Sequence, residues 1–139
     1  MKKIFFFVFL LIAFQLQAQQ DTVYTGTGLK YVQLKAGDGK KPVDGSRVKV
    51  SYTGKFLNGE VFEKLEDGDS FFFKIGDPTI IKGWSEGFKL MSQGEKGIFV
   101  LPPFLAYGSK GVKDPEGLKE YMIPPNATLV YEVELISVK

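Results

Sequence analysis

The chain has 139 residues, of which 44% are hydrophobic and 24% charged, so it is long enough for one globular domain with its own core. It contains no cysteine and no histidine. These two absences exclude disulfides, thiolate or imidazole metal sites, a cysteine nucleophile and a histidine general base. The formal net charge of +2 is too small to indicate nucleic-acid binding. Any chemistry must come from carboxylates, hydroxyls, lysines, the backbone or an apolar pocket.

Residues 1–18 have the composition of a signal peptide. Lys2 and Lys3 form a basic start, residues 4–14 are an unbroken apolar run, and Ala18 is a small residue at the expected cleavage site. The run is shorter than the about 20 residues of a transmembrane helix, and no cysteine follows it to carry a lipid. We predict an exported protein, periplasmic or secreted, with no membrane attachment after signal removal. An uncleaved anchor is the alternative.

Residues 19–28 are polar, contain two glycines and predict a flexible lead-in to one domain at 29–139. In that domain, alternating apolar and polar residues predict antiparallel strands. Asn58-Gly59 between two such runs indicates a tight hairpin turn. In the last run the odd positions from Leu129 to Leu135 are predicted to be buried, because the even positions include two glutamates. The predicted strands are 29–34, 47–56, a return beginning at 61–62, 70–75, 98–101 and 128–138.

Apolar residues at spacings of three and four predict one short amphipathic helix over residues 80–91. Gly83 and Gly87 each weaken such a helix by about 1 kcal/mol relative to alanine, so it needs support from a sheet. Residues 102–125 hold five of the seven prolines and predict a long irregular loop. The pattern as a whole predicts an α+β fold, with about five antiparallel strands in one sheet packed on one helix.

Five blocks of sequence, in order, resemble the FKBP-type peptidyl-prolyl cis-trans isomerases over residues 29–139. Each block is a weak signal alone, and the specificity lies in their order and spacing. The resemblance implies a five-stranded antiparallel sheet curled around one short helix. It also implies an isomerase that accelerates rotation about X–Pro bonds in folding polypeptides, without a cofactor or metal, and that binds macrolide inhibitors. The blocks are residues 48–54, 58–62, 80–87, 106–108 and 123–135.

The resemblance also implies a binding site. Trp84 forms its floor, while the Tyr107 hydroxyl and the Ile81 backbone N–H donate hydrogen bonds to substrate carbonyls. Glu63 joins the catalytic set where relatives usually carry an aspartate. Without the resemblance, most of the apolar positions would be assigned to the core, and Ile81 and Ile123 remain open to that interpretation. The expected walls are Tyr52, Phe62, Phe71, Ile81, Ile123 and Tyr131.

Two departures from the family pattern leave alternatives open. Glu63 moves the carboxylate by one methylene, and residues 108–122 form a longer loop than in compact relatives. The loop is either a solvated insertion or an extended rim that contacts unfolded substrate. The chain is accordingly an isomerase or a non-catalytic peptide-binding chaperone, and a structural domain with a filled pocket is a third possibility. The predicted partners are proline-containing unfolded or folding polypeptides. Because residues 19–28 are too short and polar for a dimerisation segment, we expect a monomer.

Overall fold

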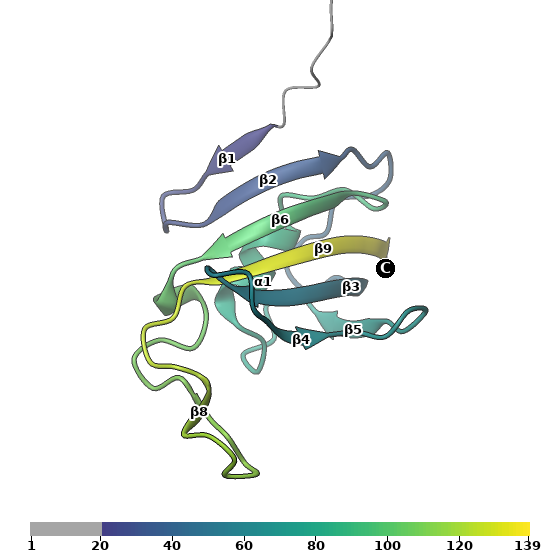
Figure 1. Ribbon diagram of the computed structural model, residues 1–139. Helices are drawn as coiled ribbons and strands as arrows, with labels where there is room; N and C mark the ends of the chain where they lie inside the picture. Colours follow the sequence, from purple (N-terminus) through teal and green to yellow (C-terminus); the bar gives the residue numbers. More distant parts are fainter. Residues whose placement is uncertain (1–20) are drawn as a thin grey trace, which may run out of the picture.

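The computed structural model describes residues 21–139 (Figure 1). The predicted signal peptide at 1–18 and the first two residues of the predicted lead-in lie outside the described residues. The strands are β1 Thr22–Tyr24, β2 Lys30–Lys35, β3 Arg47–Phe56, β4 Val61–Lys64, β5 Phe71–Lys74, β6 Lys96–Leu101, β7 Val112–Lys113, β8 Tyr121–Ile123 and β9 Leu129–Val138. The helices are α1 Lys82–Phe88 and the 3-10 helix η1 Pro103–Leu105.

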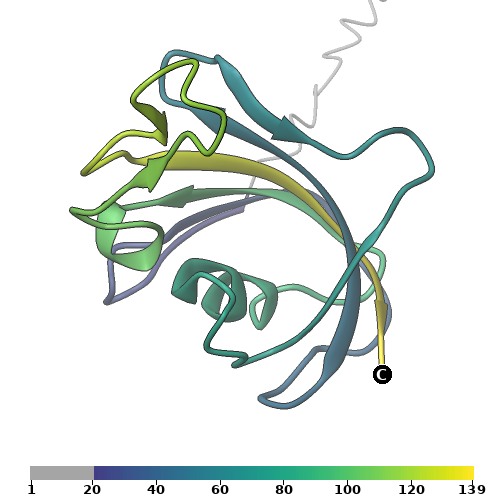
Figure 2. The same cartoon turned by 90° about the horizontal axis from the view of Figure 1, so that it is seen from below.

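One antiparallel sheet in the order β1-β2-β6-β9-β3-β4, with β5 also paired to β3, wraps around α1. Figure 2 shows α1 on the concave side of the curved sheet. This arrangement confirms the α+β class with an antiparallel sheet around one short helix. The sheet has seven strands rather than five. The difference arises because β1 extends one edge and because β4 and β5, which lie on either side of the charged segment 65–70, each pair with β3 as separate strands.

The two longest strands lie at the centre of the sheet and follow the predicted alternation. In β3 the buried positions include Val48, Val50 and Tyr52, and in β9 the odd positions 129–135 are buried. The two strands are antiparallel, and Tyr52 is opposite Val133 in the register. Apolar side chains of both strands therefore point to the side that holds α1. That side is where the functional pocket forms.

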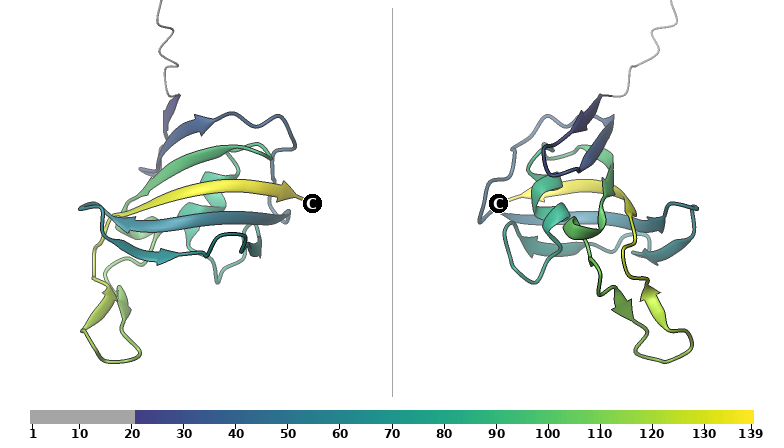
Figure 3. Two further views of the ribbon diagram at one scale, coloured as in Figure 1. Left: turned by 45° about the vertical axis from the view of Figure 1, so that its right-hand side comes forward. Right: turned by 90° about the vertical axis from the view of Figure 1, so that its left-hand side faces the viewer.

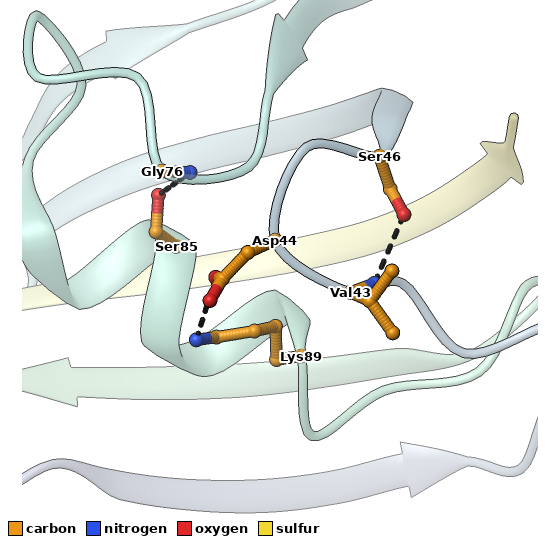
Figure 4. A network of polar contacts seen from close by, with 6 residues as sticks. All are labelled: Val43, Asp44, Ser46, Gly76, Ser85 and Lys89. Carbon is orange, nitrogen blue, oxygen red and sulfur yellow. Dashed lines mark hydrogen bonds and ion pairs between the residues drawn. The ribbon is translucent and has the colours of Figure 1, made fainter.

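The helix is shorter than predicted because the residues before it are extended. Its two glycines pack directly on β6. Ile81 precedes α1 with a ψ of 138°, so the apolar residues before it are not helical. A Cβ on Gly83 would lie 2.6 Å from Cδ2 of Leu101, and one on Gly87 would lie 2.7 Å from the ring of Phe99. Glycine thus lowers helix propensity but permits the close contact between α1 and β6. At the other end of the helix, polar contacts bind the adjacent loops, including an ion pair of 3.0 Å between Lys89 and the Asp44 carboxylate (Figure 4).

Two segments predicted to be irregular contain strands. β1 lies in the predicted flexible lead-in and pairs with β2, where Val23 is opposite Tyr31. The predicted loop 102–125 begins with η1 and continues as the β7–β8 hairpin, which projects from the sheet (Figure 3). Its prolines lie outside the strands, before β7, in the turn and after β8, so they do not interrupt the pairing. No helix among residues 21–139 is long and apolar enough to cross a membrane.

Candidate functional site

A pocket of about 170 Å³ lies between α1 and the concave face of the sheet. It contains seven of the nine predicted site residues, and these come from seven separate places along the chain. One of these residues comes from each of the strands β3, β4, β5 and β9. The other three come from the segment before α1, from α1 itself and from the segment after η1. The lining residues are Tyr52, Glu63, Phe71, Thr79, Ile80, Ile81, Trp84, Tyr107 and Tyr131.

Trp84 forms the centre of an aromatic cluster at this pocket. The side chain is 5% exposed, and its ring centroid lies 4.6 Å from that of Tyr52 and 5.3 Å from that of Tyr131. The rings meet edge to face, as does the ring of Phe71 at 5.9 Å, which is a favourable geometry for aromatic quadrupoles. The indole N–H of Trp84 has no hydrogen-bond partner within residues 21–139. The floor of the pocket is therefore a packed aromatic surface with one unpartnered N–H donor.

The carboxylate of Glu63 reaches the pocket in spite of its extra methylene. The hydroxyl of Tyr52 donates to Oε1 of Glu63 at a distance of 2.5 Å. Burial raises the pKa of the Tyr52 hydroxyl, and this hydrogen bond together with the charge of Glu63 raises it further. Glu63 itself is exposed on β4, so it holds the buried Tyr52 from the solvent side. It acts on the pocket by orienting a wall residue.

Tyr107 is held in place by the backbone around it. Its carbonyl accepts from the N–H of Gly111 at 3.2 Å, and the next residue, Gly108, bonds to Pro103 and Asn126, both at 2.8 Å. These contacts fix the position of Tyr107 between η1 and the β7–β8 hairpin. The half-buried Tyr107 side chain therefore lines the pocket from a constrained segment.

The hydroxyls of Tyr107 and Tyr131 are electrostatically linked. Burial raises the pKa of Tyr107, as does the charge of Glu63, whereas hydrogen bonding with Tyr131 lowers it. Burial is also the main cause of the raised pKa of Tyr131, and its hydrogen bond with Tyr107 adds to the increase. Both hydroxyls therefore keep their protons at neutral pH, and that of Tyr107, which lines the pocket, can serve as a neutral hydrogen-bond donor.

The segment before α1 supplies a second donor. The N–H of Ile81 donates to no backbone carbonyl in the described part of the chain. Thr79 and Ile80, which sequence reasoning missed, also line the pocket. The carboxylate of Asp77 accepts from the N–H of Thr79 at 2.9 Å and thereby lowers its own pKa. The Asp-x-Thr pattern of this turn was the available sequence signal for an ordered segment at this place.

Two of the predicted wall residues lie outside the pocket lining. Phe62 packs between Phe56 and Tyr131, with ring centroids at 4.9 and 5.8 Å, and so supports the pocket from behind. Ile123 is 6% exposed and belongs to the core at the end of β8. Sequence pattern identifies both as apolar but does not show which side of the aromatic layer they occupy.

The pocket offers neutral hydroxyls, a backbone N–H, the indole N–H of Trp84, one carboxylate at the rim and apolar surface. Within residues 21–139 no group of three acidic side chains is placed to hold a metal ion. Tyr107 and Ile81 supply neutral hydrogen-bond donors at this pocket, and the aromatic floor supplies its apolar surface. This arrangement suits the binding of a short peptide with an apolar residue.

The comparisons with known proteins agree with this geometry. The family model of the FKBP-type peptidyl-prolyl cis-trans isomerases matches residues 38–136. FK506-binding protein 1 of Dictyostelium discoideum is 41% identical over 113 residues, which are 81% of this chain and 99% of that protein. FK506-binding protein 4 of Mycosarcoma maydis is 36% identical over 88% of this chain, but the chain spans only 30% of that protein's length.

The FKBP-type peptidyl-prolyl cis-trans isomerase FkpA of Escherichia coli is 40% identical over 116 residues, or 83% of this chain and 39% of that protein. Its crystal structure superposes with a TM-score of 0.75 and 38% identity, covering 87% of this chain and 53% of the FkpA chain. The similarity covers both the sheet and the helix that builds the pocket. On these grounds, the chain belongs to the family of FKBP-type peptidyl-prolyl cis-trans isomerases.

Proposed function

We propose that this chain catalyses cis–trans isomerisation of X–Pro bonds, with the aromatic pocket as its active site. The observation that supports this function best is the combination of an aromatic floor at Trp84 with neutral hydrogen-bond donors in one pocket. Tyr107 and Ile81 line this pocket together with Trp84. The N–H of Ile81 donates to no backbone carbonyl among residues 21–139, and the indole N–H of Trp84 has no partner there. The reaction makes and breaks no covalent bond, so it requires no residue type that the composition lacks.

Amide resonance is the barrier that such a pocket must lower. Rotation about a peptide C–N bond costs about 18–20 kcal/mol, and an X–Pro bond takes tens to hundreds of seconds to isomerise unaided. In the twisted transition state the lone pair returns to nitrogen, and the amide loses part of its charge separation. An apolar aromatic surface therefore favours the twisted state over the planar one. Hydrogen bonds from Tyr107 and Ile81 to flanking carbonyls hold the substrate while the bond rotates.

Glu63 acts in this mechanism by positioning, through the hydrogen bond that it accepts from Tyr52. Tyr52 in turn packs against the floor at Trp84. A glutamate at this place preserves the contact, so we expect the pocket to tolerate the departure from the family's aspartate.

The substrates are proline-containing unfolded or folding polypeptides, and the signal-peptide pattern of residues 1–18 supports clients in the periplasm or outside the cell. Because the chain spans less than half of the length of FkpA, the clients of that longer protein are not transferred to it. We further propose that macrolide inhibitors bind the same pocket and that the protein is a monomer.

The test is isomerisation of a short Ala-Pro peptide, followed by NMR exchange spectroscopy so that no protease is needed. Tyr107→Phe removes one donor and should lower kcat/KM about two- to tenfold, the value of one hydrogen bond. Trp84→Leu should lower it further by removing the floor. A macrolide should raise the Tm of the unaltered protein. No acceleration by the unaltered protein at micromolar concentration would overturn the proposed activity.

A second candidate function, peptide binding without turnover, is favoured by the β7–β8 hairpin. Leu118 in its turn is 83% exposed, Met122 on β8 is also exposed, and both line a cleft of about 510 Å³. Exposed apolar side chains on a projecting hairpin suit transient contact with unfolded chains. If Tyr107→Phe and Trp84→Leu abolish isomerisation but leave suppression of client aggregation intact, binding is the main function.

A further inference from the structure

A second cleft, of about 410 Å³, lies on the outer face of the sheet, where β5, β3 and β9 run side by side. The register places Lys74, Arg47 and Lys139 next to one another across the three strands. Two residues further along, Phe72, Lys49 and Ser137 form the next row. Inward-facing residues such as Val48 and Phe73 alternate with them and are buried. The six outward side chains thus form a compact array, which we call the cationic cleft.

The cationic cleft has four positive charges and no carboxylate side chain. None of the four cations forms an ion pair with a carboxylate of residues 21–139, whose ion pairs involve other lysines. The acidic groups nearest in sequence are Asp44, which pairs with Lys89, Glu134, which pairs with Lys96, and Asp77. The pKa of Asp77 is lowered by its hydrogen bonds with Thr79 and also by the charge of Lys74. Like charges directly opposite each other destabilise a sheet. An anion bound between these cations would relieve their repulsion, so the array is a candidate anion site.

An aromatic side chain adds apolar surface to this charge. Phe72 is 68% exposed, and Nζ of Lys49 lies 5.8 Å from its ring centroid. The row of Lys74, Arg47 and Lys139 is fixed by the backbone, because Ile75 donates to Ser46 at 2.9 Å and Arg47 and Lys139 exchange two hydrogen bonds. The array is therefore a preformed surface with a hydrophobic contact beside its cations.

One strand separates the cationic cleft from the active-site pocket. In β5, Phe71 lines the pocket while the next residue, Phe72, lines the cleft. β5 pairs only with β3, so its other edge is open, as its position at the border of the sheet shows (Figure 1). A polypeptide that leaves the pocket can cross this edge within a few residues. It then lies over the cations on the outer face.

We propose that the cationic cleft binds an acidic segment of the same polypeptide whose proline occupies the pocket. This inference rests on the proposed function and names a substrate class for it: proline-containing chains with a cluster of carboxylates a few residues from the proline. Neighbouring strands are about 4.8 Å apart and alternate residues about 7 Å apart, so the array spans about 10 by 7 Å. That footprint fits two to four carboxylates.

Charge distribution favours a short acidic peptide over a nucleic acid or an anionic membrane. After exclusion of Lys2 and Lys3, the chain has 16 basic and 16 acidic residues and no net charge. Nucleic-acid-binding domains combine a basic patch with a high overall positive charge that supplies long-range attraction. Here the attraction is confined to one small array within a neutral molecule.

The test compares two peptides with the same Ala-Pro core, one carrying four glutamates after a short Gly-Ser spacer and the other four glutamines. Isomerisation is measured by NMR exchange at 20 and 500 mM salt. Exposed ion pairs each contribute a factor of about 1.5 to 5, so we expect kcat/KM to be about three- to tenfold higher for the acidic peptide at low salt. High salt should remove the preference because it screens exposed charges.

The double variant Arg47→Gln/Lys74→Gln should lose the preference while retaining the activity on the neutral peptide. Lys30→Gln/Lys35→Gln removes the same charge from β2, three strands away, and should retain the preference. Equal kcat/KM for both peptides at low salt, or a preference that persists in the Arg47→Gln/Lys74→Gln variant, would overturn the proposal.

Binding separates this proposal from the catalytic one. If neither peptide is isomerised, the proposed function fails, and the cleft is then tested by fluorescence anisotropy with a labelled proline-free glutamate peptide. Binding that is lost in Arg47→Gln/Lys74→Gln supports the acidic-segment assignment, and absence of binding overturns it. Single-stranded oligonucleotide and vesicles with anionic lipid are then tested as competitors of the labelled peptide. If either displaces it at a lower concentration than the unlabelled peptide does, the assignment of a polypeptide as the ligand of the cationic cleft is overturned.

Discussion

Replacing Gly87 with alanine tests how α1 is seated on the sheet. A Cβ at this position would lie 2.7 Å from Cε1 and Cζ of Phe99 and 2.9 Å from Cε2. Carbon atoms of neighbouring side chains normally approach to about 3.5–4.0 Å, so the ring or the helix must move by about 1 Å. Phe99 is fully buried, and its ring lies 5.0 Å from Phe88 and 5.6 Å from Tyr31. The ring therefore has no free space to enter.

The sign of the effect distinguishes packing from helix propensity. Overpacking a core by one methyl group costs about 1–3 kcal/mol. Alanine in place of glycine within a helix returns about 1 kcal/mol. We expect a net loss of about 1–2 kcal/mol in the free energy of unfolding, whereas the same change in an isolated helix would stabilise it. Because Trp84 lies three residues earlier in the same helix, a shift of α1 should also lower isomerase activity.

Urea-induced unfolding followed by far-UV circular dichroism measures the change in stability. Phe99→Leu in the Gly87→Ala background provides the control. Leucine alone leaves a cavity, but it removes the ring atoms that the new methyl group contacts. The double variant should therefore lose less stability than the sum of the two single variants. If Gly87→Ala is as stable as the unaltered protein, or more stable, the contact with Phe99 is not the reason for glycine at this position.

Two further predictions concern the tyrosines of the pocket. Glu63→Ala should lower the free energy of unfolding by about 1–3 kcal/mol, because it leaves the buried hydroxyl of Tyr52 without its acceptor. Tyr52→Phe should lower it by about 1 kcal/mol or less, because the exposed carboxylate of Glu63 is then readily solvated. The opposite order in chemical denaturation would contradict this prediction. Folding raises the pKa of the hydroxyls of Tyr52, Tyr107 and Tyr131. As the pH rises, the unfolded chain therefore loses these protons first, near pH 10. The contribution of the three hydroxyls to stability should be constant up to about pH 9 and decrease above pH 10. Thermal unfolding at stepped pH measures this, and a Tm that rises between pH 10 and 11 would refute it.

Sequence periodicity predicted the centre of the fold well because that part is governed by one-sided burial. The strands β3 and β9 each have one face on the core, and their alternation is unambiguous over residues 47–54 of β3 and 129–135 of β9. The same pattern fails in β5, where Phe71, Phe72 and Phe73 are consecutive. Register alone decides that Phe71 faces the pocket and Phe72 the outer cleft, and register depends on pairing with β3.

The segments that sequence reasoning missed depend on tertiary pairing rather than on composition. β1 has only three residues, all exposed, and exists because β2 offers it an edge. The hairpin β7–β8 has short strands whose prolines all lie outside the pairing. For the pocket, the local signal at Asn58-Gly59 predicted the hairpin that brings β4 beside β3. The roles of Tyr107 and Ile81 were implied by the family resemblance, and the helix pattern placed Ile81 inside the helix rather than before it. Thr79 was missed although the Asp-x-Thr pattern marks the turn that Asp77 forms there.

The pocket gives the absence of histidine and cysteine a physical meaning. A site built on acid–base chemistry needs a group that titrates near neutral pH, and the composition provides no histidine or cysteine for it. Instead, burial raises the pKa of Tyr52, Tyr107 and Tyr131, so each hydroxyl keeps its proton over the whole physiological range. A neutral donor can hold a carbonyl without competing for the amide lone pair, and an aromatic floor contributes no charge that would favour the planar, more polar amide. The composition thus matches a reaction in which the environment of the bond changes and its atoms do not.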